Sequence, residues 1–360
     1  MILNEVLFAY GLEPADYHIQ NFGSGLINHT FKVSGKGKEY ILQELNTNVF
    51  KSPDSIAYNL SLIQSYLEEQ FPSYLFVGPL ASITGNFLFK SRSGNYYRLF
   101  QFVTGSHTIN AVSTGKEAFE AAKQFGRFTR ALRDLEPRSL KYTLTDFHNL
   151  ELRFSEFKKV ESKAEPEKWA LASDEINALY SNYSIIQTYS NIIAKKEIPI
   201  RIIHHDTKIS NVLFDDNENG LCVIDLDTVM PGYFLSDVGD MMRTYLSAAS
   251  EEETDLDKIG IREEIFTSIC SGYLSEMGDT LTKKELQYFV FSGELMIYMQ
   301  AIRFLTDFLN NDVYYGSKYP GHNLNRAKNQ FKLLNEYINH QQSFSEIVSH
   351  LENDSYSLKS

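Results

Sequence analysis

The chain has 360 residues, of which 43% are hydrophobic and 22% are charged. This length and composition indicate a globular protein with room for two lobes. The formal net charge of −12 argues against broad binding to nucleic acid or an anionic membrane, because both are polyanions. A small anionic ligand stays compatible, since it needs only local donors and a metal ion.

Several sequence features bear on the cellular compartment of the protein. No apolar run approaches the roughly 20 residues that span a bilayer. The N-terminal segment lacks a basic region, and Glu5 interrupts its apolar part, so it does not resemble a secretory signal. Cys222 and Cys270 lie in an apolar strand and at a helix end, which favours buried, reduced thiols. We expect a cytoplasmic protein with no membrane or nucleic-acid partner.

The first hundred residues are rich in predicted strands. Residues 18–35 indicate two strands joined by a glycine turn, and "KEYILQEL" at 38–45 indicates a third. A helix follows over 52–70, with Ser52 as its N-cap, and then a hairpin over 85–103. Together these elements predict a small antiparallel sheet with one helix.

After Thr104 the apolar residues recur at three and four positions, which is typical of helices. The predicted helical segments are 115–135, 172–196, 257–275, 283–309 and 323–340. Short strands interrupt them at 200–225.

The predicted organisation is therefore an N-terminal nucleotide-binding lobe over 1–103 and a larger, mostly helical lobe over 104–345. The linker lies near 102–107, and a polar, frayed tail follows over 346–360. Clefts between lobes are common ligand sites.

The stretch "IIHHDTKISNVLFDDNENGLCVIDLDT" at 202–228 carries the chemistry. Phosphoryl transfer to a hydroxyl needs one carboxylate to orient that hydroxyl, and an amide oxygen and second carboxylate to hold Mg²⁺ against the phosphates. Asp206 follows an apolar strand, and a predicted hairpin returns Asp225 beside Asn211. The structural alternatives are a turn with local Asx hydrogen bonds at Asp206 and Asn211, and a strand-end cap at Asp225.

Two further residues flank this motif. Asp227 follows Asp225 at spacing two, so both would face the same side of a regular strand. It would bind a second Mg²⁺ or a coordinated water, or else hold backbone amides in a loop. His204 is predicted to tie the catalytic loop by hydrogen bonds.

The segments "HHDTKISN", "VIDLD" and "SDVGDMMR" (236–243) resemble the aminoglycoside phosphotransferase and choline kinase-like family. This resemblance implies an α+β, protein-kinase-like fold with a small antiparallel-sheet lobe and a larger helical lobe. It also implies an ATP- and Mg²⁺-dependent small-molecule kinase. Asp206 would be the catalytic base and touch the acceptor, Lys208 would lie near the transferring phosphate, and Asn211, Asp225 and Asp227 would hold metal.

Within this family, "ILQELN", "DTKISNVLFD", "CVIDLDTVMPG" and "IRFLTDFL" look like segments of kinases that phosphorylate the C1 hydroxyl of N-acetylhexosamines. The implied partners are a sugar and ATP. The alternatives are a kinase of an amino alcohol, an aminoglycoside phosphotransferase, or an inactive nucleotide-binding protein of this fold. The sequence leaves open whether the protein is a monomer or a homodimer.

The resemblance places the nucleotide in the smaller lobe. The family's phosphate-covering loop coincides with Gly23, Ser24, Gly25 and Asn28, where glycines let backbone amides approach phosphate oxygens. The adenine would dock against the linker by backbone hydrogen bonds, and the linker residues concerned are Phe102, Val103 and Thr104.

One departure from the kinase pattern concerns the third strand, which usually carries a lysine that pairs with a helix glutamate. Here Gln43 occupies the lysine position, and Asn59 falls roughly at that of the glutamate. A neutral amide pair would orient strand and helix without supplying charge. Phosphate neutralisation would then rest on Mg²⁺ and Lys208, or on Arg98.

Two acidic residues of the segment 236–243 are predicted to be structural. Asp237 would accept hydrogen bonds from backbone amides of the catalytic loop. Asp240 and Arg243 are three residues apart and would pair on one helix face.

The acceptor site is predicted in 298–323, where Arg303 and Asp307 are four residues apart on one helix face. They would read sugar hydroxyls as donor and acceptor, or else form an intrahelical salt bridge. Tyr315 and His322, with the neighbouring Tyr314, would stack on a sugar ring or close the pocket.

Two cationic acceptors make different demands. An aminoglycoside would want a dense carboxylate surface, and the stretch 249–260 is acidic, although such a loop is more often a solvated face. Choline would want an aromatic cage, for which the 22 tyrosines leave room.

Overall fold

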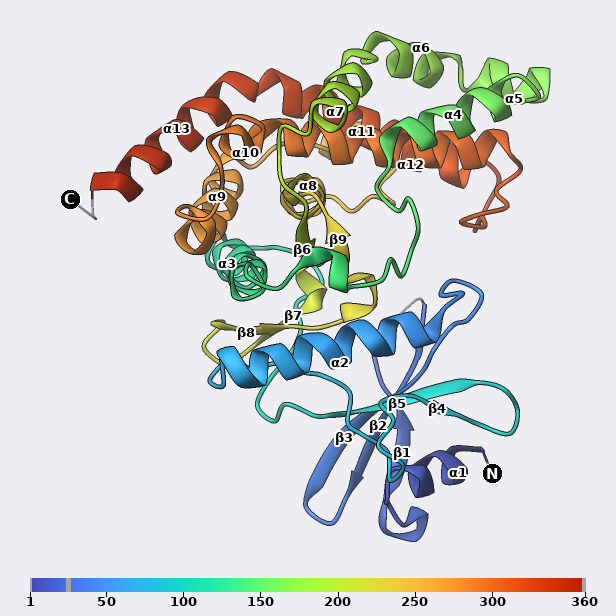
Figure 1. Ribbon diagram of the computed structural model, residues 1–360. Helices are drawn as coiled ribbons and strands as arrows, with labels where there is room; N and C mark the ends of the chain where they lie inside the picture. Colours follow the sequence, from blue (N-terminus) through green and yellow to red (C-terminus); the bar gives the residue numbers. More distant parts are fainter. Residues whose placement is uncertain (1, 24–26, 358–360) are drawn as a thin grey trace.

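The computed structural model describes residues 2–23 and 27–357, with side chains through residue 352. Its N-terminal lobe holds an antiparallel five-stranded sheet in the order β1-β2-β3-β5-β4 (Figure 1). The strands are β1 (His18–Asn21), β2 (His29–Gly35), β3 (Lys38–Glu44), β4 (Phe89–Lys90) and β5 (Tyr96–Gln101). The sequence predicted these strands, and the sheet order places β5 directly beside β3.

Two helices accompany this sheet. Helix α2 (Pro53–Gln70) begins at Pro53 after the N-cap residue Ser52, as predicted. Helix α1 (Ile2–Ala9) was not predicted, and its Val6 and Leu7 are buried in the core of the sheet. A helix of this length is stabilised by packing rather than by its own propensity, so periodicity alone gives little signal.

The hydrophobic cores of the two lobes do not follow the predicted sequence ranges 1–103 and 104–345. The sheet has its own small cluster, which includes Val33, Leu42 and Leu99. The apolar face of α2, with Ile56 and Leu60, belongs instead to the large core of the C-terminal lobe. Figure 1 shows α2 lying between the sheet and that lobe. The helix therefore ties the smaller lobe to the larger one.

The C-terminal lobe is mostly helical, with four short strands at its base. Its helices are α3 (Gly115–Ala131), α4 (Leu150–Glu161), α5 (Pro166–Leu171), α6 (Ser173–Ser181), α7 (Ser184–Lys195), α8 (Phe234–Tyr245), α9 (Glu263–Met277), α10 (Lys283–Gln287), α11 (Phe289–Leu309), α12 (His322–Asn339) and α13 (Gln341–Ser357). Strand β6 (Arg201–Ile203) pairs with β9 (Met230–Gly232), and β7 (Val212–Phe214) pairs with β8 (Gly220–Val223). The two-lobe fold predicted from the resemblance is thus confirmed.

Several predicted boundaries differ from those in the structure, such as those of α3 and α9, and helices α4 and α5 were not predicted. The segment 172–196 forms two helices, α6 and α7, and the segment 283–309 forms α10 and α11. Helix α13 runs through most of the range expected to be a frayed tail. It is held because Phe344 stacks on Phe266 with ring centroids 3.7 Å apart and Val348 is buried.

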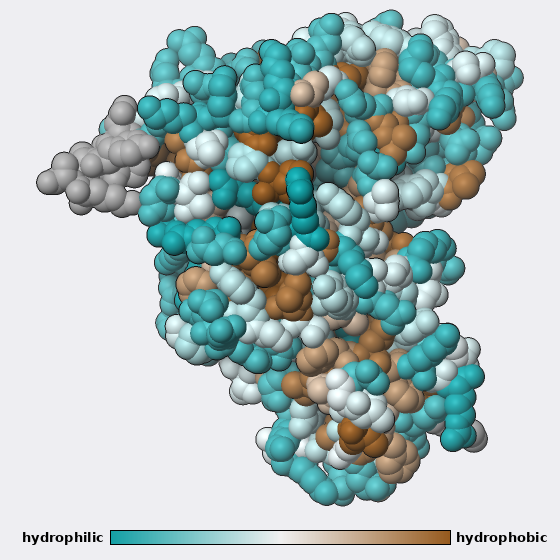
Figure 2. All heavy atoms as spheres, viewed as in Figure 1, coloured by the Kyte–Doolittle hydropathy of each residue, from teal (hydrophilic) through white to brown (hydrophobic). Residues whose placement is uncertain are grey.

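The surface hydropathy and the state of the two cysteines match what the sequence predicted. Hydrophilic residues prevail on the face in Figure 2, and hydrophobic atoms show in patches between them. Within the described ranges, no helix combines the length and apolarity that a bilayer crossing requires. Cys222 and Cys270 are free and buried, as predicted.

Candidate active site

The catalytic loop is the turn 204–208 that follows strand β6, and helix α8 anchors it. The Asp237 carboxylate accepts hydrogen bonds from the amides of His204 (2.9 Å) and His205 (2.7 Å). Asp240 accepts from the amide of Thr207 at 3.0 Å. This confirms the predicted role of Asp237. Because these acceptors come from a buried helix, the backbone beside Asp206 is fixed before any ligand binds.

Helix α8 also carries the predicted ion pair. The guanidinium of Arg243 lies 2.9 Å from the carboxylate of Asp240, three residues earlier. Arg243 contacts Glu251 as well, at 3.0 Å. Burial raises the pKa of Asp240 while the attraction of Arg243 lowers it, and burial prevails.

The three residues of the predicted motif lie together. Asn211 donates from Nδ2 to the carbonyl of Asp206 at 2.9 Å, and its own carbonyl accepts from the amide of Ile224 at 2.8 Å. The Nε2 atom of His204 lies 2.9 Å from the carbonyl of Ile224, which confirms its predicted tying role. These bonds join the catalytic loop to the end of β8, and Asp225 is the next residue along the chain.

Asp206 forms a close pair with Lys208, whose Nζ donates to Oδ2 at 2.9 Å. Burial raises the pKa of Asp206, but attraction to Lys208 outweighs it and holds the pKa below its ordinary value. Burial lowers the pKa of Lys208, and the carboxylates of Asp206 and Asp225 outweigh that effect and raise it. Both groups are therefore charged at neutral pH.

Asp225 is in the opposite electrostatic situation. Its side chain is exposed, but the protein around it reduces its hydration, and this effect, followed by the nearby carboxylates of Asp227 and Asp206, raises its pKa to about 6. Its backbone is left-handed, with φ of 60°, at the point where β8 ends. Within the described residues, no hydrogen bond or ion pair engages its carboxylate. An unpaired carboxylate beside two others is a site that favours a cation.

Asp227, in contrast, is fully engaged between the lobes. One carboxylate oxygen accepts from Arg98 Nη1, and the other accepts from Asn28 Nδ2 at 2.8 Å. Asp227 is 1% exposed and Arg98 is 3% exposed. Asn28 in turn accepts from the amide of Asn46 at 3.0 Å. The predicted metal ligand and the predicted phosphate donor thus contact each other instead of standing free.

Arg98 supplies the cation that the third strand lacks. Gln43 and Arg98 are partners in the β3–β5 register, and Gln43 Oε1 accepts from Arg98 Nε (3.1 Å) and Nη2 (2.8 Å). Gln43 therefore holds the guanidinium rather than an amide of α2. Asn59 Nδ2 donates to the carbonyls of Lys141 (2.8 Å) and Val229 (3.1 Å), and Asn59 Oδ1 accepts from the amide of Lys141 at 2.8 Å. The hypothesis of a Gln43–Asn59 amide pair is wrong, because each side chain has other partners.

The glycine loop and linker border the cleft. Gly23 has φ of +74°, a conformation that glycine adopts without strain, and the predicted Ser24 and Gly25 lie outside the described residues. The ring of Phe22 packs edge-on against Phe102 at 6.1 Å.

In the linker itself, the carbonyl of Val103 accepts from the amide of Ser106 at 3.3 Å and from its hydroxyl at 2.6 Å. Thr104 is exposed. The carbonyl of Val103 is therefore already occupied, and so is the amide of Phe102, which donates to the carbonyl of Glu39 at 3.1 Å.

At the acceptor end, Asp307 is engaged within the protein. Its two oxygens accept from the amides of Tyr314 (2.8 Å) and Tyr315 (2.9 Å), and Asn323 also donates to it at 3.1 Å. The intrahelical salt bridge with Arg303 weighed as an alternative is not the arrangement found. Asp307 therefore shapes the segment 310–321, which differs from the free acceptor-binding group that the sequence suggested.

His322 has a similar supporting place. It is 3% exposed, its Nε2 lies 2.6 Å from Glu252, and its Nδ1 accepts from the amide of Lys318 at 3.3 Å. Its ring packs on Tyr319 with centroids 4.8 Å apart. Its polar atoms are thus satisfied by the protein, which also differs from the predicted ligand contact.

Arg303 is left without a carboxylate partner among the described residues. Its guanidinium donates only to neutral oxygens, those of Gln300 (3.2 Å) and Tyr314 (3.4 Å). The rings of Phe147, Tyr314 and Tyr315 surround it at 5.5 to 5.7 Å. An aromatic surround leaves the charge available, because cation–π contacts stabilise it without neutralising it.

The acidic stretch 249–260 is not a free carboxylate surface. Glu251 pairs with Arg243 at 3.0 Å and contacts Arg326. Glu252 contacts Arg326 at 3.4 Å and His322 at 2.6 Å. Arg326 of helix α12 neutralises both glutamates, and no sequence pattern predicted this role.

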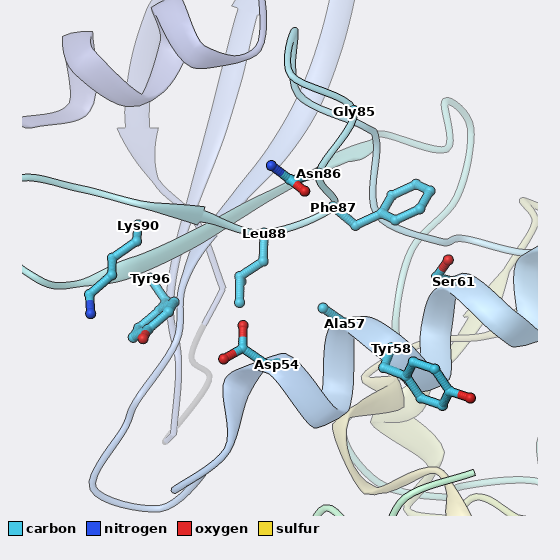
Figure 3. A pocket seen from close by; sticks show the side chains of 10 residues that line it. All are labelled: Asp54, Ala57, Tyr58, Ser61, Gly85, Asn86, Phe87, Leu88, Lys90 and Tyr96. Atoms are coloured by element: carbon cyan, nitrogen blue, oxygen red, sulfur yellow. The ribbon is translucent and has the colours of Figure 1, made fainter. Parts of the chain in front are cut away.

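A cavity of about 650 Å³ lies away from these groups, in the N-terminal lobe. Figure 3 shows it between helix α2, with Asp54 and Tyr58, and the segment before β4, with Phe87 and Leu88. None of the motif residues lines it. The candidate site therefore stays at the interface of the lobes, where Asp206 and Asp225 converge.

Residues 18–261 match the model of the phosphotransferase enzyme family. The chain belongs to this family. The predicted family and the coarse activity, a small-molecule phosphotransferase, are thereby confirmed. The match spans the whole motif region from the glycine loop to the stretch beyond helix α8.

Solved structures show the same fold at low identity. An aminoglycoside phosphotransferase from Alicyclobacillus acidocaldarius is 12% identical, with 97% of each chain covered and a TM-score of 0.65. An amicoumacin kinase in complex with AMP-PNP, Ca²⁺ and its antibiotic is 14% identical, with 93% of each chain covered and a TM-score of 0.63. Choline kinase from Cryptosporidium parvum is 16% identical, covering 97% of this chain and 99% of that one, with a TM-score of 0.57.

Proposed function

We propose that this phosphotransferase is an ATP- and Mg²⁺-dependent kinase of a neutral sugar, with the C1 hydroxyl of an N-acetylhexosamine as the acceptor. The observation that carries the neutral acceptor is Arg303, whose cation has no carboxylate partner among the described residues. An ammonium acceptor beside an unpaired guanidinium would be repelled in a pocket of low dielectric. A ring hydroxyl or an amide oxygen would accept from the same group.

The roles on the catalytic loop follow from charge and position. Asp206 is ionised and would orient the acceptor hydroxyl and take its proton as the phosphoryl group transfers. Lys208 lies within hydrogen-bond distance of Asp206, so its ammonium would offset charge that develops on the phosphoryl oxygens. Both residues act in the ionisation states that their surroundings favour.

Asn211 and Asp225 would hold the metal ion. The unpaired carboxylate of Asp225, with its raised pKa, fits a divalent cation, because a cation relieves the repulsion from Asp206 and Asp227. Among the described residues, no three His, Cys, Asp or Glu form a ready metal cluster. Mg²⁺ commonly takes one or two protein ligands and completes its shell with phosphate and water. When bound, it neutralises charge on the phosphates.

Asp227 would act indirectly, by pairing with Arg98 across the lobe interface. Its oxygens are taken by Arg98 and Asn28, so it would join a metal shell only by giving up a buried ion pair. Arg98 is the group positioned by Gln43, and its charge lies behind the carboxylates rather than on a free surface. We therefore assign Asp227, Gln43 and Asn28 to holding the lobes together.

The nucleotide would enter between the glycine loop and the linker. Gly23, with Ser24 and Gly25, would cover the phosphates, and the backbone of Phe102 and Thr104 would meet the adenine. Since the carbonyl of Val103 already accepts from Ser106 and the amide of Phe102 donates to Glu39, the adenine would bond to the other backbone groups of residues 102–104.

The acceptor would lie between Asp206 and the aromatic surround of Arg303. Tyr315 packs against Phe304 at 5.0 Å and is mostly buried, so it offers a wall rather than a flexible lid. Asp307 and His322 would act indirectly, because they fix the segment that carries Tyr314 and Tyr315.

An ADP-release assay with Mg·ATP tests this proposal. The acceptor panel is N-acetylglucosamine, N-acetylgalactosamine, glucose, choline, 1-amino-2-propanol and kanamycin, and phosphorus NMR identifies the product. We expect the highest kcat/KM with an N-acetylhexosamine and a sugar 1-phosphate product. Fastest turnover of choline, the amino alcohol or kanamycin would overturn the acceptor assignment. Nucleotide binding without turnover of any acceptor would instead indicate an inactive protein of this fold.

A further inference from the structure

The loop 145–149 lies next to the catalytic loop and is held rigidly. Arg153 donates from Nη2 to the carbonyls of Asp146 (2.8 Å) and Phe147 (3.3 Å). The hydroxyl of Tyr189 donates to the carbonyl of His148 at 3.3 Å. Asn149 then caps helix α4 by accepting from the amide of Leu152 at 3.1 Å. The side chains at positions 147 and 148 are therefore placed by their backbone.

One edge of the His148 ring faces the residue before the catalytic aspartate. His148 Nδ1 lies 3.4 Å from His205 Nδ1, and the ring of Phe147 stacks on His148 with centroids 4.2 Å apart. His205 is itself fixed, because a Cβ at Gly232 would lie 2.5 Å from its ring. The imidazole of His148 is thus held one residue away from Asp206.

The other edge of the ring is available. The printed contact of the ring is at Nδ1, no described residue bonds to Nε2, and the residue is partly exposed. Burial, then His205 and Arg303, lowers the pKa of His148 well below its ordinary value. The ring is therefore neutral at physiological pH, and a neutral imidazole can exchange a hydrogen bond with a hydroxyl in either direction.

The ring of His148 lies near Arg303, whose charge is one of those that lower its pKa. The guanidinium of Arg303 lies 5.7 Å from the ring of Phe147, the neighbour that stacks on His148. A charged donor and a neutral imidazole thus lie on either side of Phe147, and the imidazole contacts the residue before Asp206. The proposed acceptor offers matching groups, because a sugar hydroxyl both donates and accepts and an amide has a donor and an acceptor at a fixed spacing.

We propose that His148 is an acceptor-binding residue, whose Nε2 forms a hydrogen bond with a hydroxyl or amide group of the acceptor next to the phosphorylated hydroxyl. This inference rests on the proposed function and deepens it. It adds a specificity contact from the loop before α4, which lies outside the motif segments.

Two amide variants separate ligand contact from internal structure. The amide of Asn in His148→Asn occupies roughly the place of Nδ1, so it keeps the contact with His205 and leaves the ligand side empty. The longer amide in His148→Gln reaches the place of Nε2, so it keeps the ligand side. The assay measures KM for N-acetylglucosamine and KM for ATP in both variants and in the wild type.

We expect His148→Asn to raise the acceptor KM about tenfold or more and to leave KM for ATP within about twofold, because one hydrogen bond to a neutral group is lost. We expect His148→Gln to stay within about threefold of the wild type. The reverse order, with Asn active and Gln impaired, would show that only the His205 contact matters and would overturn the proposal. Equal activity of both variants would overturn it as well.

Failure of the proposed function gives a different result. If the wild type turns over another member of the panel and not N-acetylglucosamine, the sugar assignment falls, and the two variants are compared on that acceptor instead. Thermal melting and ATP binding check that each variant folds. If His148→Asn fails to fold, His148→Phe, which keeps the stacking on Phe147, must show the same loss of acceptor affinity. Its retention of wild-type acceptor KM would contradict the inference.

Discussion

The two ends of the cleft leave charges of opposite sign unpaired. At the end beside the catalytic loop, Asp225 is a carboxylate with no partner among the described residues, and its pKa is raised to about 6. At the acceptor end, Glu251 and Glu252 are paired, and Arg303 is the cation without a carboxylate. An unpaired charge repels ligands of its own sign, so the first end suits a metal ion, and the second disfavours an ammonium group and suits the hydroxyl and amide oxygens of the proposed acceptor.

The paired charges are equally informative. Arg98 and Asp227 are both buried and contact each other across the lobe interface, so they stabilise the closed arrangement rather than await a ligand. Glu251 and Glu252 look like a carboxylate surface in the sequence, yet Arg243 and Arg326 neutralise them. Counting charges in a segment therefore misleads unless their partners are known.

The largest expected effect comes from Asp206→Asn. The amide keeps the size of the side chain and cannot take the hydroxyl proton, so kcat should fall about 10²- to 10⁴-fold. Nucleotide affinity, measured by titration calorimetry, should stay within a few-fold. The matched control is Asp216→Asn in the exposed turn between β7 and β8, which should have wild-type kcat. A fully active Asp206→Asn variant would show that the roles are misassigned.

The next effect tests the lobe interface through Arg98→Met. Removing one member of a buried pair leaves Asp227 uncompensated and should cost about 3–5 kcal/mol of unfolding free energy. Urea denaturation measures this loss. The double variant Arg98→Met with Asp227→Asn should recover part of it, because no isolated charge remains. If the single variant is as stable as the wild type, the contact contributes nothing to holding the lobes.

A smaller effect is expected from Arg303→Met, which removes the unpaired cation at the acceptor end. The acceptor KM for an N-acetylhexosamine should rise about tenfold, because a charge-assisted hydrogen bond is lost. Arg92→Met is the control, since that side chain is 94% exposed and lies in the N-terminal lobe. Steady-state kinetics with saturating ATP decides the matter, and an unchanged acceptor KM would remove Arg303 from the site.

The smallest effect concerns the stability of the metal-free protein with Asp225→Asn. The folded pKa of about 6 lies above the ordinary value of 3.8, so folding favours the protonated form. That stabilisation is complete below pH 3.8 and is lost as the pH rises through about 6.

At pH 8 the variant should therefore melt slightly higher than the wild type, by about 1–2 °C because solvent screens an exposed side chain, and near pH 4 the two should coincide. Mg·ATP should raise the melting temperature of the wild type only. A variant that melts lower at pH 8 would show that Asp225 is stabilised by its surroundings and is not an unpaired carboxylate.

The sequence was sufficient where the contacts are local. The spacing of Asp240 and Arg243 predicted their pairing on one helix face, and the hairpin after Asn211 predicted the position of Asp225. These inferences work because helix and hairpin geometry fix neighbours a few residues apart.

The sequence was insufficient where the partner comes from a distant element. The pairing of Arg98 with Asp227 depends on the register of β5 beside β3 and on how the lobes dock. The amides that occupy Asp307 and the ring that meets His205 come from loops with no periodicity. Such contacts are set by tertiary packing, which spacing alone does not encode.

The most direct test of the central claim compares two acceptors that share one ring. Glucosamine carries an ammonium where N-acetylglucosamine carries a neutral amide, so kcat/KM for both at pH 7 measures whether the acceptor end rejects a cation. We expect N-acetylglucosamine to be preferred by about tenfold or more and Arg303→Met to reduce this preference. Equal or better turnover of glucosamine by the wild type would contradict it.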